Sequence, residues 1–179
     1  MAVVSRGPAV NPEPRIVRSA DENRLAGLTA LPYDGNPYRA SEGRHRLIAG
    51  VLQPAPGTYD VVFDTPSRGR AGRFGFRFWE GDATPPAVRV LGVRGGALEL
   101  RVTDGGSGVD PTSLVARIDG EERSLTYASG LVRVSLNGLP RGSHKLVFTA
   151  ADYQEAKNNE NVRGILPNTR MLQRAFTIR

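Results

Sequence analysis

Cysteine is absent from this 179-residue chain. Without thiols the protein has no disulfides, no cysteine nucleophile and no cysteine-ligated zinc. The sequence also lacks an apolar run of about 18 residues, so we expect no membrane span. Its first residues, MAVVSRGPAV, lack the apolar segment of a secretory signal peptide. We therefore expect either a cytosolic protein or, as we favour, a piece of a longer secreted protein that begins with an added methionine.

Lysine is scarce, with only Lys145 and Lys157, so arginine supplies nearly all of the 24 basic residues. Against 18 acidic residues they give a net charge of +6. A basic balance is typical of proteins that bind nucleic acid. An arginine bias is also what a GC-rich genome produces. We favour this second explanation, which needs no function, and expect no nucleic-acid partner.

Turn residues and alternating apolar positions dominate what is present. The chain has 21 glycines and 13 prolines, which favours an all-β class. In ALELRV, Leu98, Leu100 and Val102 share one face, the period-2 pattern of a half-buried strand. Asp119-Gly120 predicts a tight hairpin. Similar alternation recurs in residues 87–93, 113–118, 123–127, 131–136, 144–150 and 174–179.

These segments make about seven strands in about ninety residues, which predicts an immunoglobulin-like β-sandwich over residues 87–179. Residues 81–86, GDATPP, combine turn residues and prolines and are the expected boundary. Residues 14–82 are expected to form a small β-sandwich-like module, and residues 1–13 a flexible tail. The predicted fold is therefore all-β, with tandem β-sandwich modules.

In the first module, Phe74, Phe76 and Phe78 alternate and are predicted to be core. Trp79 has the opposite parity and is predicted to cover the module junction. Arginines interleave with these aromatics in residues 68–79, a composition that is found in proteins binding single-stranded nucleic acid. Because the phenylalanines are expected to be buried, we do not favour that function.

The second half resembles a known family in several stretches: TPP, VTDGGSGVDP, IDG, LPRGSHKLVFTAAD and KNNENVRGILPNTR. It is similar to the immunoglobulin-like modules at the C-terminal ends of secreted bacterial proteins, above all the region after the catalytic domain of subtilisin-like serine proteases. GTYDVVFDT and GRFGFRFWEGDATPP resemble the module that precedes it there. The resemblance covers roughly residues 45–179.

This resemblance implies a non-catalytic accessory region of an extracellular or cell-surface protease, and it carries over no catalytic residue. The region would stabilise, space or orient the catalytic domain of the same parent chain, or engage an extracellular protein substrate. The alternative is a stand-alone adhesion or carbohydrate-binding protein. That function predicts exposed aromatics that form a flat platform, for which Tyr33, Tyr38 and Trp79 are the only candidates.

Motifs for catalysis are missing from the sequence. A serine protease needs a histidine beside its serine, and the two histidines, His45 and His144, have no G-x-S-x-G context. We predict that both are structural and that the chain is not an enzyme. The glycine-rich stretch DGGSGVDP, residues 104–111, lacks the lysine of a phosphate-binding loop. Its glycines are better suited to a tight connection between strands.

A calcium site is a candidate at one end of the predicted sandwich, where the loops after residues 103 and 151 would meet. Oxygen ligands suited to Ca²⁺ would come from two stretches of chain. The alternative, which we favour, is that Asp104 and Asp152 cap turns through backbone N–H groups. The candidate ligands are Asp104, Asp110, Asp152, Glu155 and Asn158.

The connection from residue 153 to residue 170 is about eighteen residues long, which is unusual in a compact domain. Long loops on rigid scaffolds often carry binding residues. Alternatively the loop covers the sandwich edge, with Ile165 and Leu166 turned inward. We hold both interpretations open.

Overall fold

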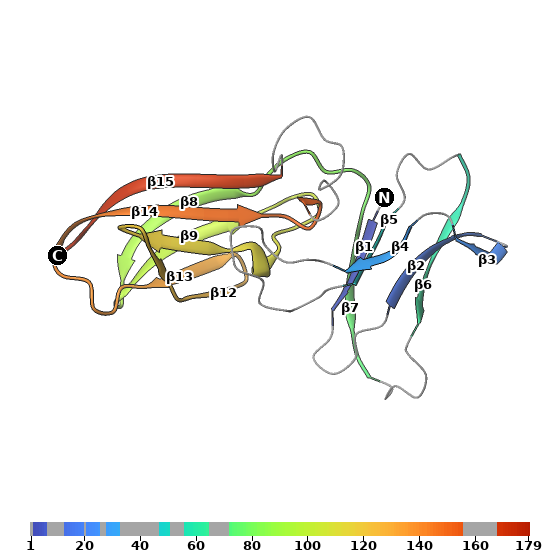
Figure 1. Cartoon of the computed structure of the whole chain (residues 1–179), viewed down its shortest axis with the longest axis horizontal. Helices are drawn as coiled ribbons and strands as arrows, with labels where there is room; N and C mark the ends of the chain where they lie inside the picture. The colour runs from blue at the N-terminus through green and yellow to red at the C-terminus, as the bar shows by residue number, and fades with distance from the viewer. Residues whose placement is uncertain are drawn as a thin grey trace. The chain divides into compact units, whose positions relative to one another are not determined.

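A computed structural model of the chain describes residues 2–6, 13–19, 21–25, 28–32, 47–50, 56–64, 72–155 and 168–179. Antiparallel strands dominate these residues, with one short 3₁₀ helix, which confirms the all-β prediction (Figure 1). None of the helices in the described ranges is long and apolar enough to cross a membrane. The described residues up to Asp82 form one compact unit, and those from Ala83 to Arg179 form another.

The first unit contains two sheets, in the strand orders β4-β5-β1-β7 and β3-β2-β6. Residues 2–6 of the segment expected to be a flexible tail form β1, which pairs with both β5 and β7. The prediction of a flexible tail was therefore wrong for these residues. Pairing with β5 on one edge and β7 on the other gives hydrogen-bond partners to the backbone of β1. The strands are β1 (Ala2–Arg6), β2 (Glu13–Arg18), β3 (Asp21–Leu25), β4 (Leu28–Pro32), β5 (Leu47–Gly50), β6 (Tyr59–Asp64) and β7 (Gly75–Trp79).

The prediction that the phenylalanines in and before β7 are core residues was wrong. Phe74, Phe76 and Phe78 are 39%, 58% and 43% exposed, whereas Trp79 is only 6% exposed. β7 is the edge strand of its sheet, so it has a neighbouring strand, β1, on one side only. The ring of Phe63 in β6 packs at a tilt against two of them, with ring centroids 5.1 Å from Phe74 and 4.9 Å from Phe76. The burial of these phenylalanines, on which the argument against nucleic acid depended, is therefore incomplete.

The second unit contains two four-stranded sheets, β12-β13-β9-β8 and β11-β10-β14-β15. The expected hairpin forms at Asp119 and Gly120, which both have positive φ, of 54° and 92°. The single strand expected over residues 123–127 is instead divided between β11 and β12. The elements are β8 (Ala87–Arg94), β9 (Ala97–Thr103), η1 (Pro111–Ser113), β10 (Val115–Ile118), β11 (Glu121–Arg123), β12 (Leu125–Ala128), β13 (Leu131–Ser135), β14 (Gly142–Ala151) and β15 (Thr169–Ile178).

One hydrophobic core draws side chains from both sheets of this unit. The predicted inward positions of β9, Leu98, Leu100 and Val102, are all fully buried. Their neighbours in the core come from β13 and from β10 and β14 of the other sheet: Val132, Val134, Ala116, Ile118, Leu146, Phe148 and Ala150. The alternating pattern therefore identified the buried faces of these strands.

Candidate functional site

The DGGSGVDP loop and the end of β14 lie together at one end of the second unit, as the calcium hypothesis required. Val109 and Asp152 form an isolated antiparallel bridge. The Asp110 N–H donates to the Ala151 carbonyl at 3.0 Å, and the Tyr153 N–H donates to the Gly108 carbonyl at 3.1 Å. Backbone pairing between residues about forty positions apart in the chain thus builds this acidic end.

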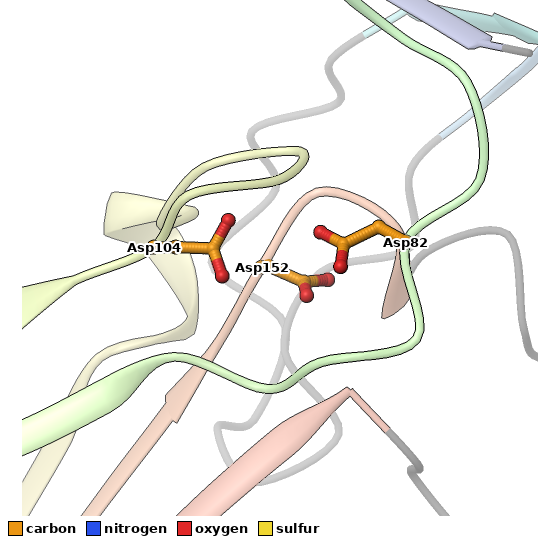
Figure 2. A group of neighbouring side chains, drawn as sticks. All are labelled: Asp82, Asp104 and Asp152. Atoms are coloured by element: carbon orange, nitrogen blue, oxygen red, sulfur yellow. The ribbon is translucent and has the colours of Figure 1, made fainter.

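Two of the five candidate ligands come close to one another there, together with a residue that sequence reasoning missed. One carboxylate oxygen each from Asp82, Asp104 and Asp152 lie within 4.8 Å of one another (Figure 2). Asp82 belongs to the segment leading into β8, where the Pro86 carbonyl accepts a hydrogen bond from Arg170 Nε at 3.3 Å. The sequence offered Asp82 only as part of a boundary segment, because its spacing from the other two follows no motif.

Asp104 and Asp152 also cap turns, the role that we favoured. Asp104 Oδ2 accepts the N–H groups of Gly106 and Gly108 at 3.0 and 2.6 Å. Asp152 Oδ1 accepts the Glu155 N–H at 3.0 Å, and Oδ2 accepts Asn168 Nδ2 at 2.6 Å. A carboxylate oxygen has more than one lone pair, so capping and cation binding are compatible.

Asp110 and Glu155 do not join this group of three carboxylates. Asp110 Oδ1 caps η1 by accepting the N–H and the hydroxyl of Thr112 at 2.9 and 2.8 Å. Glu155 Oε2 accepts the Thr169 hydroxyl at 3.0 Å. The other oxygen of each carboxyl is buried without a hydrogen-bond partner in the described structure. Asn158 lies outside the described residues, as do Ile165 and Leu166.

Burial has an electrostatic consequence at Glu155. Removal from water penalises the charged form and raises the pKa of the Glu155 carboxyl, and the hydrogen bond from Thr169 opposes that rise only in part. The carboxylate oxygens that lie close together belong to Asp104 and Asp152 and not to Glu155, so the arrangement favours these two aspartates as the groups for a cation.

A second titratable pair lies on the His144 side of the fold. His144 Nδ1 is 2.7 Å from Asp119 Oδ2, and Nε2 is 2.9 Å from the Pro140 carbonyl oxygen. Asp119 Oδ1 also accepts the Lys145 N–H at 2.8 Å. An ionised carboxylate and a carbonyl can only accept, so both ring nitrogens must donate, as only the protonated imidazole can.

The pKa values of this pair move apart for the same reason. The hydrogen bond to Asp119, followed by that to Pro140, raises the pKa of His144. The hydrogen bond from His144, followed by that from the Lys145 backbone, lowers the pKa of Asp119. Sequence reasoning expected a structural His144 but missed its carboxylate partner, which comes from the Asp119-Gly120 hairpin.

The arrangement resembles the histidine–carboxylate half of a catalytic triad but leaves no nitrogen for a nucleophile. A triad histidine uses one ring nitrogen for the carboxylate and the other for the serine. Here the second nitrogen, Nε2, forms its hydrogen bond with the Pro140 carbonyl. Ser143 lines the same open pocket, yet as the neighbour of His144 in β14 it faces the opposite side of the strand. His45 lies outside the described residues.

The structure describes one of the three candidates for the aromatic platform, Trp79. Its side chain is buried, and Tyr33 and Tyr38 lie outside the described residues. The exposed aromatic side chains of the described residues are Phe76 and Phe78 of β7 and Phe74, the residue before β7.

No family model, no curated protein and no solved structure matches this chain.

Proposed function

We propose that this chain is a non-catalytic, C-terminal accessory region of a secreted subtilisin-like serine protease, which stabilises, spaces or orients the catalytic domain or engages its substrate. The observation that carries the proposal is the use of both ring nitrogens of His144 by Asp119 and Pro140. The histidine–carboxylate pair that most resembles part of a catalytic triad therefore acts as a link between the Asp119 hairpin and the Pro140 loop, which we call the His144 clamp. The resemblance of residues 45–179 supplies the protease context.

We further propose that the second unit is an immunoglobulin-like β-sandwich. Its sheet orders follow those of such domains if β8, β9, β12 and β13 are strands A, B, D and E, and β10, β11, β14 and β15 are C, C′, F and G. The shared core of the two sheets supports this assignment. In such modules the loops at each end are the variable, interacting parts, and the acidic end is one of them.

The stand-alone carbohydrate-binding alternative is less well supported. A platform that binds sugar rings by stacking needs flat exposed aromatic rings, and Trp79 is buried. The exposed side chains of Phe74, Phe76 and Phe78 instead form an apolar strip, which suits contact with another protein surface. This strip supports an accessory role in which the first unit contacts the parent's catalytic domain.

Native mass and active-site labelling test the proposal. An antibody to this chain would recover the native protein from cells and medium, which is then treated with a fluorophosphonate probe for serine hydrolases. We expect a secreted species much larger than 19.3 kDa that the probe labels. An unlabelled species of about the mass of this chain would overturn the proposal and leave a free-standing binding protein.

A further inference from the structure

The outer face of the sheet β12-β13-β9-β8 carries an excess of arginine. Leu98, Leu100 and Val102 of β9 turn into the core, so Glu99 and Arg101 lie on the opposite face.

The strand register shows which residues of β8 and β13 share this outer face. Arg89 of β8 lies directly opposite Arg101, and Arg133 of β13 lies directly opposite Glu99. Arg94 is opposite Ala97, which shares the parity of Glu99. We define the arginine face as the exposed side chains Arg89, Arg94, Arg101 and Arg133.

Among the residues that the structure describes, an acidic side chain neutralises only one of these four charges. Glu99 is 7% exposed and forms an ion pair with Arg133, with Nη1 and Oε1 2.9 Å apart. Arg101 Nη1 donates to the Ser129 carbonyl at 3.3 Å, which leaves its charge uncompensated. Within the described part of the chain, the side chains of Arg89 and Arg94 form neither an ion pair nor a hydrogen bond. Three positive charges of this face are therefore left without a carboxylate partner in the described structure.

This placement is unfavourable for the protein alone. Like charges directly opposite one another on neighbouring strands repel, and the Cβ atoms of such a pair are about 5 Å apart. The other described acidic side chains of this unit lie away from Arg89 and Arg101. Asp104 and Asp152 are at the end of the unit, and Glu121 and Glu122 are on β11 of the other sheet. A polyanion lying along β8 and β9 would supply the missing charge.

We propose that the arginine face binds an acidic polysaccharide through its carboxylate or sulfate groups. The guanidinium fork matches such planar or tetrahedral anions in two-hydrogen-bond geometry. Thr103 and Thr126 are exposed on the same face and offer hydroxyls for the sugar hydroxyls. No aromatic side chain projects from the outer face of these four described strands, so the bases of a single-stranded nucleic acid have no stacking platform.

A binding experiment on the full chain tests the proposal with two probes, heparin for sulfate and polygalacturonate for carboxylate. The face variant combines Arg89→Gln and Arg101→Gln. The control variant combines Arg141→Gln and Arg174→Gln, which removes the same charge from exposed positions elsewhere. We expect the chain to bind both probes at low salt and to be released by added salt. The face variant should bind about tenfold or more weakly, as expected when charged hydrogen bonds are lost. The control should change less than twofold.

Thermal melting separates lost binding from lost folding. The face variant removes a repulsive pair, so its melting temperature should be no lower than that of the parent chain. Equal weakening by both variants would overturn the proposal, since the attraction would then depend on net charge alone. Duplex DNA binding as tightly as the polysaccharides, and lost in the face variant, would also overturn it in favour of phosphate recognition. The accessory role proposed above does not depend on any of these outcomes.

Discussion

At the scale of single residues, the most informative group is His144, which links the hairpin at Asp119 to the loop at Pro140. A protonated ring satisfies both acceptors, whereas a neutral ring has one N–H and must leave one acceptor without a donor. The stabilising effect of the raised His144 pKa is fully present below the ordinary histidine pKa of about 6.5 and is lost as the pH rises through the raised value. The lowered Asp119 pKa acts at acid pH, because its contribution to stability is lost only as the pH falls through that lowered value.

Thermal melting against pH checks this effect. We expect the melting temperature of the parent chain to fall as the pH rises above the ordinary histidine pKa of about 6.5 and through the raised value of His144. In a His144→Gln variant this pH dependence should be largely absent, because glutamine keeps a donor for Asp119 but has no proton to lose in that range. His45→Gln, at the only other histidine, is the matched control and should retain the full pH dependence. A His144→Gln protein with an unchanged pH profile would show that the clamp does not titrate as described.

At the scale of elements, the acidic end joins the DGGSGVDP loop to the end of β14. Asp104 and Asp152 approach within 4.8 Å, so they repel each other in the absence of a cation. The calcium hypothesis stays a prediction, and melting with Ca²⁺ or EDTA tests it. We expect millimolar Ca²⁺ to raise the melting temperature and EDTA to reverse the rise. At a free concentration about 100 times Kd, mass action adds about 2.7 kcal/mol.

The variant Asp104→Asn separates a cation site from a simple turn cap. Asparagine retains a side-chain oxygen that can accept the Gly106 and Gly108 N–H groups, but it removes one negative charge. We expect this variant to match or exceed the parent's stability in EDTA and to lose the response to Ca²⁺. Glu121→Gln, at an exposed acid on β11, should leave the response intact. If Ca²⁺ leaves the parent's melting unchanged, the aspartates act only as caps.

Elements with one buried face were the most predictable from the sequence. The alternation in β9, β13 and β14 indicated both the strands and their inward residues, because burial on one side enforces a period of two. The same pattern failed in β7, where alternation marks a face but cannot reveal that the strand lies at a sheet edge. Asp104 and Asp152 were predictable from the loops that carry them. The pairing of Asp119 with His144, 25 residues apart, depends on strand register, which no local pattern encodes.

At the scale of the whole molecule, each unit has buried apolar residues of its own. The core of the second unit is built from strands β9, β10, β13 and β14. In the first unit, Ile16, Val17 and Trp79 are buried. Trp79 is the only tryptophan in the chain, so its fluorescence reports on the first unit alone. Far-UV circular dichroism reports on the strands of both units.

We therefore predict that the two units unfold separately. Denaturant unfolding of the full chain should give fluorescence and circular dichroism curves that do not coincide, which is the mark of more than one cooperative unit. Phe148→Ala provides the decisive variant, because the side chain is fully buried in the second core and its removal costs about 3–5 kcal/mol. It should move the circular dichroism transition to lower denaturant while the Trp79 fluorescence transition stays in place. If both transitions moved together, the units would share one cooperative structure, and an accessory role built from two independent modules would have to be abandoned.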